Sequence, residues 1–155
     1  MTQIIFGERI GQQGKIRVGC AAVLFDEERE KILLTRRADT GQWCLPSGGM
    51  EPGESMAETC IREVYEETGL NVRVERLTSI CSNQDRLVIY DDGSQFQIVS
   101  INFEVSLING EPGLSDETTA IGYYSPAEIE KMDLFPHHRQ FIADTLTGQD
   151  AAFIR

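Results

Sequence analysis

The sequence has few of the features that point to nucleic-acid, zinc or membrane chemistry. Its 155 residues include 14 lysines and arginines against 25 aspartates and glutamates, so the formal net charge is −11. No basic patch is visible, which argues against non-specific binding to nucleic acid or to an anionic membrane. The 4 cysteines are widely spaced and form no C-x-x-C pair. This excludes the usual zinc and redox motifs.

Long apolar runs are also missing. No segment is long enough to span a bilayer, and nothing resembling a secretory signal precedes the first expected strand. Hydrophobic residues make up 41% of the chain and charged residues 25%, which is ordinary for a soluble protein. We therefore expect one domain over residues 1–155, a cytoplasmic location and reduced thiols. Cys60 is expected to be a buried structural thiol.

A glycine-rich loop that leads into an acidic helix, residues 48–70, is the most informative segment. Glu63, Glu66 and Glu67 stand at i, i+3 and i+4, so their side chains meet on one helix face. Like charges in this arrangement repel one another and weaken a helix, so we expect a cation among them. Carboxylate oxygens suit Mg²⁺ or Mn²⁺. For the three glutamates taken alone, a solvated helix face is the alternative.

Local signals set the limits of this helix. Ser55 with Glu58 three residues later is a capping box, and Gly69 suits the C-terminal cap. The predicted core-facing stripe consists of Met56, Ala57, Cys60, Ile61 and Val64. The three glutamates are predicted to point largely away from it.

Further elements follow from hydrophobic patterning and turn signals. Strands are expected at residues 3–6, 17–25, 31–37, 71–82, 86–90, 95–107 and 120–124. The second and third of these, joined by a charged turn, are predicted to form a hairpin. Helices are expected at residues 126–132 and 136–146, and residues 148–155 are left open between a loose end and a packed tail. This order suggests a mixed sheet covered on both faces.

The acidic segment also carries a longer pattern, G-x5-E-x7-R-E-U-x-E-E-x-G-U, in which U is aliphatic. The specified positions are filled by Gly48, Glu54, Arg62, Glu63, Val64, Glu66, Glu67, Gly69 and Leu70. A run of this length is hard to meet by chance, and through it the chain resembles the Nudix hydrolase family. The resemblance implies an α/β fold, specifically an α/β/α sandwich with a mixed sheet. It also implies hydrolysis of the diphosphate linkage in a nucleoside diphosphate joined to another group X.

The resemblance further implies roles for individual residues. The expected metal ligands for Mg²⁺ or Mn²⁺ are the Gly48 carbonyl, Glu63, Glu66 and Glu67. The expected catalytic set is Glu66, Glu67, Arg62 and Glu117. Within that set Arg62 would hold a glutamate in position, and the general base would be either a glutamate of the helix or Glu117, which otherwise is an exposed loop residue. Glu54 would tie the loop to the helix.

Contacts to the substrate are expected from Arg36, Arg37 and Gly49. The two arginines close a strand, where they could reach a phosphate or simply lie on the surface, and the glycine lets the loop backbone approach a phosphate. Two roles are left open for Trp43, which are stacking on a base and packing in the core. His137 and His138 are interpreted as surface or capping residues.

A nucleotide-binding regulatory module with the same fold and no turnover is the alternative function. Such a module tends to lose glutamates from the pattern at residues 48–70, and this chain has kept them all. The small-molecule nucleotide substrate stays open among ADP-ribose, dinucleoside polyphosphates, oxidised nucleoside triphosphates and sugar nucleotides. Many proteins of the family pair as homodimers, so that state is also left open.

Overall fold

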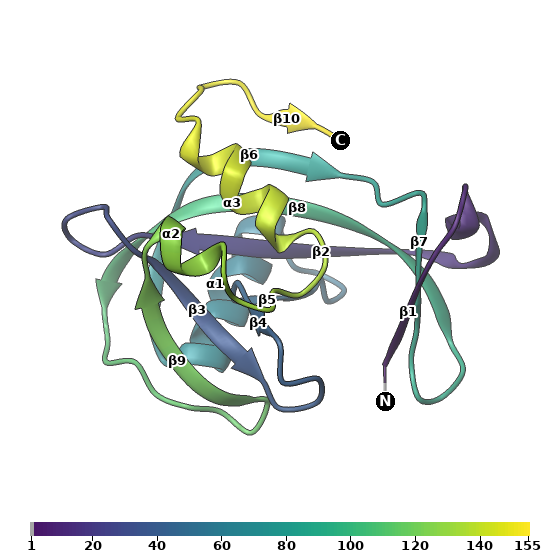
Figure 1. Ribbon diagram of the computed structural model, residues 1–155, viewed down its shortest axis with the longest axis horizontal. Coiled ribbons are helices and arrows are strands. Elements are labelled where there is room, and N and C mark those ends of the chain that lie inside the picture. The colour runs from purple at the N-terminus through teal and green to yellow at the C-terminus, as the bar shows by residue number, and fades with distance from the viewer. Residues whose placement is uncertain (1) are drawn as a thin grey trace.

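The computed structural model describes residues 2–155 and shows a mixed α/β fold with two sheets (Figure 1). Over these residues the larger sheet has 7 strands: β1 (Gln3–Phe6), β2 (Lys15–Leu24), β5 (Ser47–Gly49), β6 (Asn71–Cys81), β7 (Arg86–Ile89), β8 (Gln95–Asn109) and β10 (Phe153–Ile154). The smaller sheet has the order β4 (Trp43–Cys44), β3 (Ile32–Arg37), β9 (Thr118–Tyr124). The helices are α1 (Met56–Thr68), α2 (Pro126–Ile129) and α3 (His138–Leu146), with a 3₁₀ turn at Ile10–Gln13. Across residues 2–155 no helix combines the length and apolarity needed to cross a membrane.

The long strand β8 organises the larger sheet. It pairs in parallel with β2, from Lys15 opposite Phe96 to Leu24 opposite Val105, and antiparallel with β6 and β7. The sheet is therefore mixed, as predicted. The tail also packs, because β10 pairs in parallel with β6.

Helices cover both faces of this sheet, and β2 lies between them. The side chains of β2 alternate, as in any strand, between two core clusters. One cluster joins Cys20, Ala22 and Leu24 to Cys60 and Val64 of α1. The other joins Ala21 and Val23 to Phe141 and Ile142 of α3. Figure 1 shows α3 in front of the sheet and α1 behind it. The sandwich prediction is confirmed.

The predicted hairpin of residues 17–25 with 31–37 is wrong. These segments became β2 and β3, which belong to different sheets and share a single bridge between Phe25 and Ile32. The turn between them forms as expected, with Asp26 accepting the Lys31 backbone N–H at 3.0 Å. A local turn signal does not choose the partner of a buried strand, and β2 finds a longer ladder along β8.

The caps of α1 are as predicted. The Ser55 side chain accepts the Glu58 backbone N–H at 3.2 Å, and the Glu58 carboxylate accepts the Ser55 N–H at 2.7 Å. Gly69 ends the helix in the left-handed conformation with φ of 76°. These local interactions begin and end the helix where the sequence indicated.

The buried face of α1 is rotated from the predicted stripe. Cys60 and Val64 are buried as expected, whereas Ala57 and Ile61 are exposed. Glu67 is buried instead, with 9% of its surface exposed. The helix therefore brings one of its glutamates into the interior, toward the loop that carries Gly48, because β5 packs against this side.

Replacing Ser55 with alanine is expected to lower the free energy of unfolding by about 1 kcal/mol, because the Glu58 N–H loses its partner at the start of α1. Urea denaturation of wild type and Ser55→Ala measures the difference. Ser55→Asp, which keeps an acceptor at the cap, is the control and should recover most of the loss. An unchanged free energy of unfolding in Ser55→Ala would show that packing alone holds the start of α1.

Candidate active site

The Arg62 side chain joins α1 to the glycine-rich loop. Its Nε lies 2.5 Å from the Glu54 carboxylate, and its Nη2 donates to the Gly49 carbonyl at 2.9 Å. Its Nη1 donates to Glu63 at 2.8 Å and to Glu66 at 3.2 Å. Hydrogen bonding from Arg62 lowers the pKa of Glu54 to about 2. The predicted positioning role of Arg62 and the predicted tie from Glu54 both match this geometry.

Gly48 lies against the Glu63 carboxyl group. It belongs to β5, opposite Cys20 of β2, and a Cβ at this position would overlap the Glu63 carboxylate. Only glycine leaves room for the carboxylate beside the loop backbone. Gly48 and Glu63, two residues predicted to share a metal ion, therefore lie next to each other.

Glu67 is the buried acid of the site. It accepts the Ser47 backbone N–H at 3.2 Å. Burial raises the pKa of Glu67 to about 8, with the negative charges of Glu63 and Glu117 adding to the effect. Burial also raises the pKa of Glu63. The site therefore concentrates negative charge that water does not fully solvate.

A cavity of about 360 Å³ opens beside Glu67. We call it the acidic cavity, and it is lined by Thr35, Arg37, Ala38, Asp39, Cys44, Glu67, Asp116, Glu117 and Thr118. Glu117 comes from the loop before β9, far from α1 in the sequence. The fold thus brings Glu117 and Glu67 to one cavity.

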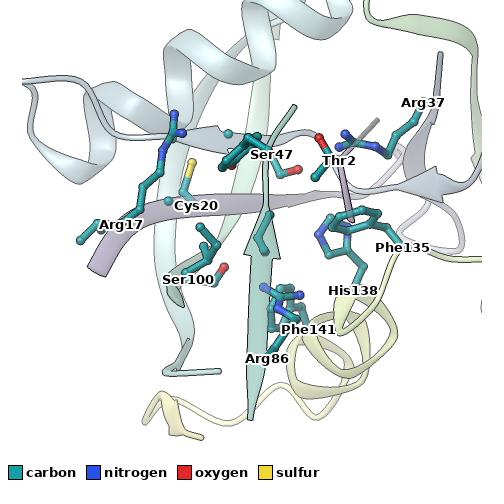
Figure 2. A pocket seen from close by; sticks show the side chains of 17 residues that line it. Thr2, Arg17, Cys20, Arg37, Ser47, Arg86, Ser100, Phe135, His138 and Phe141 are labelled. Atoms are coloured by element: carbon teal, nitrogen blue, oxygen red, sulfur yellow. The ribbon is translucent and has the colours of Figure 1, made fainter. Parts of the chain in front are cut away.

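A second pocket lies on the other side of the Gly48–Gly49 loop, between the larger sheet and α3. We call it the arginine pocket because Arg17, Arg37 and Arg86 line it, together with residues 47–49 and aromatic side chains of residues 90, 135 and 141. Figure 2 shows the three guanidinium groups entering from different sides. Arg37 borders both cavities.

The two predicted arginines lie in different places. Arg37 donates to both oxygens of Asp39, at 2.9 and 2.7 Å, and its guanidinium stacks on Phe135, with 4.7 Å from Cζ to the ring centroid. Arg36 is exposed, donates to the Gly41 carbonyl at 2.8 Å and borders neither cavity. The two neighbouring side chains therefore have different surroundings, at a point where the pairing of β3 with β9 shifts register.

The predictions for Trp43 and for the histidines have different outcomes. Trp43 packs edge-on against Tyr124, with ring centroids 5.0 Å apart, beside the α3 cluster. The interpretation as a surface or capping residue is wrong for His138. His138 is buried in the arginine pocket, and its Nδ1 accepts the Leu45 N–H at 3.0 Å. Burial lowers the pKa of His138 to about 3, so this ring is neutral. His137 precedes α3 without a side-chain cap.

Sequence analysis did not single out Arg17 and Arg86 as pocket residues. A signal for Arg86 existed, because it opens the otherwise apolar strand β7 and is followed by Leu87 and Val88. A strand of that kind is buried, and a buried arginine is rare. Nothing in the sequence indicated that β7 faces α3 across a pocket.

The oxygen donors fit a hard divalent cation, although they are not gathered around one point. Among residues 2–155 no group of three or more histidine, cysteine, aspartate or glutamate side chains is arranged to hold a metal ion. Glu63 and Glu66 both bond to Arg62, and the Glu66 side chain is 57% exposed.

Comparison with known families decides the family of the chain. The model of the NUDIX domain matches residues 15–145, which include the loop, α1, the acidic cavity and all but Thr2 of the arginine pocket lining. The chain belongs to the NUDIX family. It is therefore a Nudix hydrolase, and enzymes of this family generally use divalent metal ions and act on small nucleotide substrates.

Individual relatives agree with this assignment. A MutT-like protein of Streptomyces ambofaciens is 34% identical over 114 residues, which cover 74% of this chain and 67% of that protein. An ADP-ribose pyrophosphatase of Methanocaldococcus jannaschii is 31% identical over 116 residues, covering 73% and 64%. Mouse diphosphoinositol polyphosphate phosphohydrolase 2 is 40% identical over 72 residues, but the match spans only 46% of this chain and 40% of the mouse protein.

Solved structures share the fold. A Nudix hydrolase of Nitrosomonas europaea superposes with a TM-score of 0.70 at 28% identity, covering 89% of this chain and 93% of that one. An ADP-ribose pyrophosphatase of Streptococcus suis gives a TM-score of 0.72 at 23% identity, covering 90% and 98%. The second comparison shows the fold alone.

Replacing Glu67 with glutamine is expected to make the metal-free Nudix hydrolase less sensitive to rising pH. The pKa of Glu67 moves from an ordinary value of 4.5 to about 8 on folding. Between these values the folded protein holds a proton that the unfolded chain has released, so stability falls as pH rises through this window. Wild type is expected to lose on the order of a few kcal/mol of unfolding free energy across this window. Glutamine does not titrate, so the variant avoids this loss.

Urea unfolding in EDTA at several pH values measures this effect. The free energy of unfolding of Glu67→Gln, relative to that of wild type, should rise with pH between 4.5 and about 8. Glu51→Gln, an exposed change in the same loop, should follow wild type at every pH. A difference between Glu67→Gln and wild type that stays constant with pH would contradict the burial of this carboxyl.

Proposed function

We propose that this Nudix hydrolase cleaves the diphosphate linkage of a nucleoside diphosphate joined to another group X, with Mg²⁺ or Mn²⁺ as the metal. One observation carries the proposal. Burial and nearby negative charges disfavour the charged forms of Glu63 and Glu67. Both side chains lie beside the backbone of residues 47–49, which also borders the arginine pocket. A divalent cation together with a diphosphate would satisfy both the acids and the arginines.

The proposed metal ligands are the Gly48 carbonyl and the carboxylates of Glu63, Glu66 and Glu67. Oxygen donors of this kind suit Mg²⁺ and Mn²⁺ rather than softer ions. When bound, such an ion withdraws charge from the diphosphate oxygens and lowers the pKa of water. The contact between Gly48 and Glu63 supports this set, because it places a half-buried carboxylate against the loop backbone.

Arg62 is proposed as a positioning residue. Its bonds to Glu54 and to the Gly49 carbonyl fix the loop on α1, and its bonds to Glu63 and Glu66 orient their carboxylates. A planar guanidinium can make all these contacts at once, which an ammonium cannot. The fixed loop leaves the Gly49 backbone free to approach a phosphate oxygen.

Glu117 is the better supported general base. Glu67 has a pKa raised to about 8 in the metal-free protein, and a cation beside it would favour its charged form and occupy its oxygens. Glu117 is exposed and lines the same acidic cavity, where a water molecule beside the diphosphate could reach it. Glu67 is then assigned to the metal and Glu117 to the proton.

Arg37 is proposed to contact the diphosphate. It borders the acidic cavity and the arginine pocket, and Asp39 and Phe135 already hold its guanidinium in place. A pre-oriented arginine loses little conformational freedom when it binds a phosphate. Arg36 lacks such a location, so Arg36→Met provides a neighbouring comparison for Arg37→Met.

Glu67→Gln is expected to reduce kcat with Mg²⁺ by at least about 100-fold, because a lost metal ligand removes several kcal/mol of transition-state stabilisation. Glu117→Gln is expected to reduce kcat by about 10²–10⁴-fold, the usual contribution of a general base. Chromatography of the products resolves the activity on ADP-ribose, dinucleoside polyphosphates, oxidised nucleoside triphosphates and sugar nucleotides.

Glu51→Gln is the matched control, since this exposed glutamate lies in the same loop and should retain wild-type activity. If wild type binds a nucleotide of the panel but releases neither phosphate nor nucleoside monophosphate from any member, the regulatory module is the correct function. Full activity in Glu67→Gln would contradict the proposed role of Glu67 as a metal ligand.

A further inference from the structure

Arg86 is a buried cation whose charge has no partner in the described chain. Its residue surface is only 6% exposed. Within residues 2–155 the single hydrogen bond of its side chain runs from Nη1 to the Pro136 carbonyl at 3.3 Å, and its buried Nε has no acceptor. No carboxylate among these residues forms an ion pair with it, whereas Arg37 is paired with Asp39.

A charge in this position is costly. Removing an ion from water carries a penalty of several kcal/mol unless a counter-ion and hydrogen bonds compensate. One long hydrogen bond to a backbone carbonyl does not balance the charge of a guanidinium. An unpaired Nε–H therefore indicates a ligand that supplies both negative charge and acceptor oxygens.

The surroundings of Arg86 favour such a ligand. Its side chain lines the arginine pocket, and Figure 2 shows it beside Phe141, away from Ser47 and the glycine-rich loop. The residues lining this pocket include Arg17 and Arg37 but no aspartate or glutamate. In a chain with a net charge of −11, this is a local concentration of positive charge. The field in the pocket attracts anions.

The space fits one small group. The cavity is about 150 Å³, comparable to a cavity that holds benzene, so a phosphate can enter it. The Gly48–Gly49 backbone forms another part of its lining. A substrate whose diphosphate lies at this loop would therefore place its group X in the pocket.

We propose that Arg86 binds a phosphate monoester carried by group X, so that the enzyme selects diphosphates with a further phosphate. The guanidinium fork matches two phosphate oxygens, and Nε–H is one of the donors that such a pair uses. The substrate class rests on the function proposed above. The anion site itself does not, because Arg86 is neither a proposed metal ligand nor a proposed base.

The anion site is tested first in metal-free protein with inorganic phosphate as the probe. Phosphate added to wild type in EDTA, at constant ionic strength, should shift the Nε–H resonance of Arg86 in NMR spectra and raise the Tm. Arg86→Met should bind phosphate at least about tenfold more weakly, since bonds to a charged group contribute about 1.5–3 kcal/mol. Its Tm without phosphate should equal or exceed that of wild type, because an unpaired buried charge is gone.

Arg73→Met is the control for loss of one arginine. Arg73 is exposed on β6 and paired with Glu75, and its replacement should leave phosphate binding unchanged. Arg86→Lys keeps the charge without the fork and should bind with intermediate affinity. If Arg86→Met lowers the Tm and binds phosphate like wild type, Arg86 is only a tether for Pro136 and the proposal fails. An Arg86 resonance that responds to an uncharged nucleoside but not to phosphate also overturns it.

The substrate class is tested by the ratio of kcat/KM between a nucleoside diphosphate sugar with a phosphate on the sugar and the same compound without it. Wild type should favour the phosphorylated compound by at least about tenfold, and Arg86→Met should bring the ratio close to one. A ratio near one in wild type overturns the assigned class. Absence of hydrolysis for both compounds would count against the proposed function, while the metal-free titration still decides the Arg86 site.

Discussion

The contact between Arg62 and the glycine-rich loop is the interaction on which the site depends. A single guanidinium bonds Glu54, the Gly49 carbonyl, Glu63 and Glu66. It thereby joins the loop that approaches a phosphate to the helix that carries the acids. It also supplies the positive charge that lets neighbouring carboxylates share one helix face. Without it, both the loop position and the carboxylate orientations would be set by repulsion.

Charge is separated across the Gly48–Gly49 loop. On the acidic side, Glu67 and Glu117 share a cavity, and burial holds the Glu67 carboxyl in its neutral form. On the other side, Arg86 lies buried without a counter-ion among residues 2–155. Each half is unfavourable by itself, since the acidic side keeps a carboxyl group from its charged form and the other side buries a charge that water would stabilise. A cation on one side and an anion on the other would relieve both, which is how a metal–diphosphate complex is built.

The local parts of the fold were predictable, whereas the pairing of strands was not. Ser55 and Gly69 mark the ends of α1 through hydrogen bonds and backbone freedom that act within one helical turn. The partner of β2 depended on which distant strand offered the longer ladder, and the turn at Asp26 carried no information about this. The short strands β4 and β5 escaped prediction because their pairing partners, not their own residues, define them.

By itself the sequence determined the family, the acidic helix and the position of Arg62, because these depend on residue spacings along one loop and one helix. The tertiary structure decided that Glu67 is the buried acid and that Arg37 rather than Arg36 lines the cavities. It also decided that His138 lies inside a pocket. It also placed Arg86 there, with no ion-pair partner in the part of the chain that the structure describes. Burial and charge pairing are set by neighbours far away in the chain, and no local pattern records them.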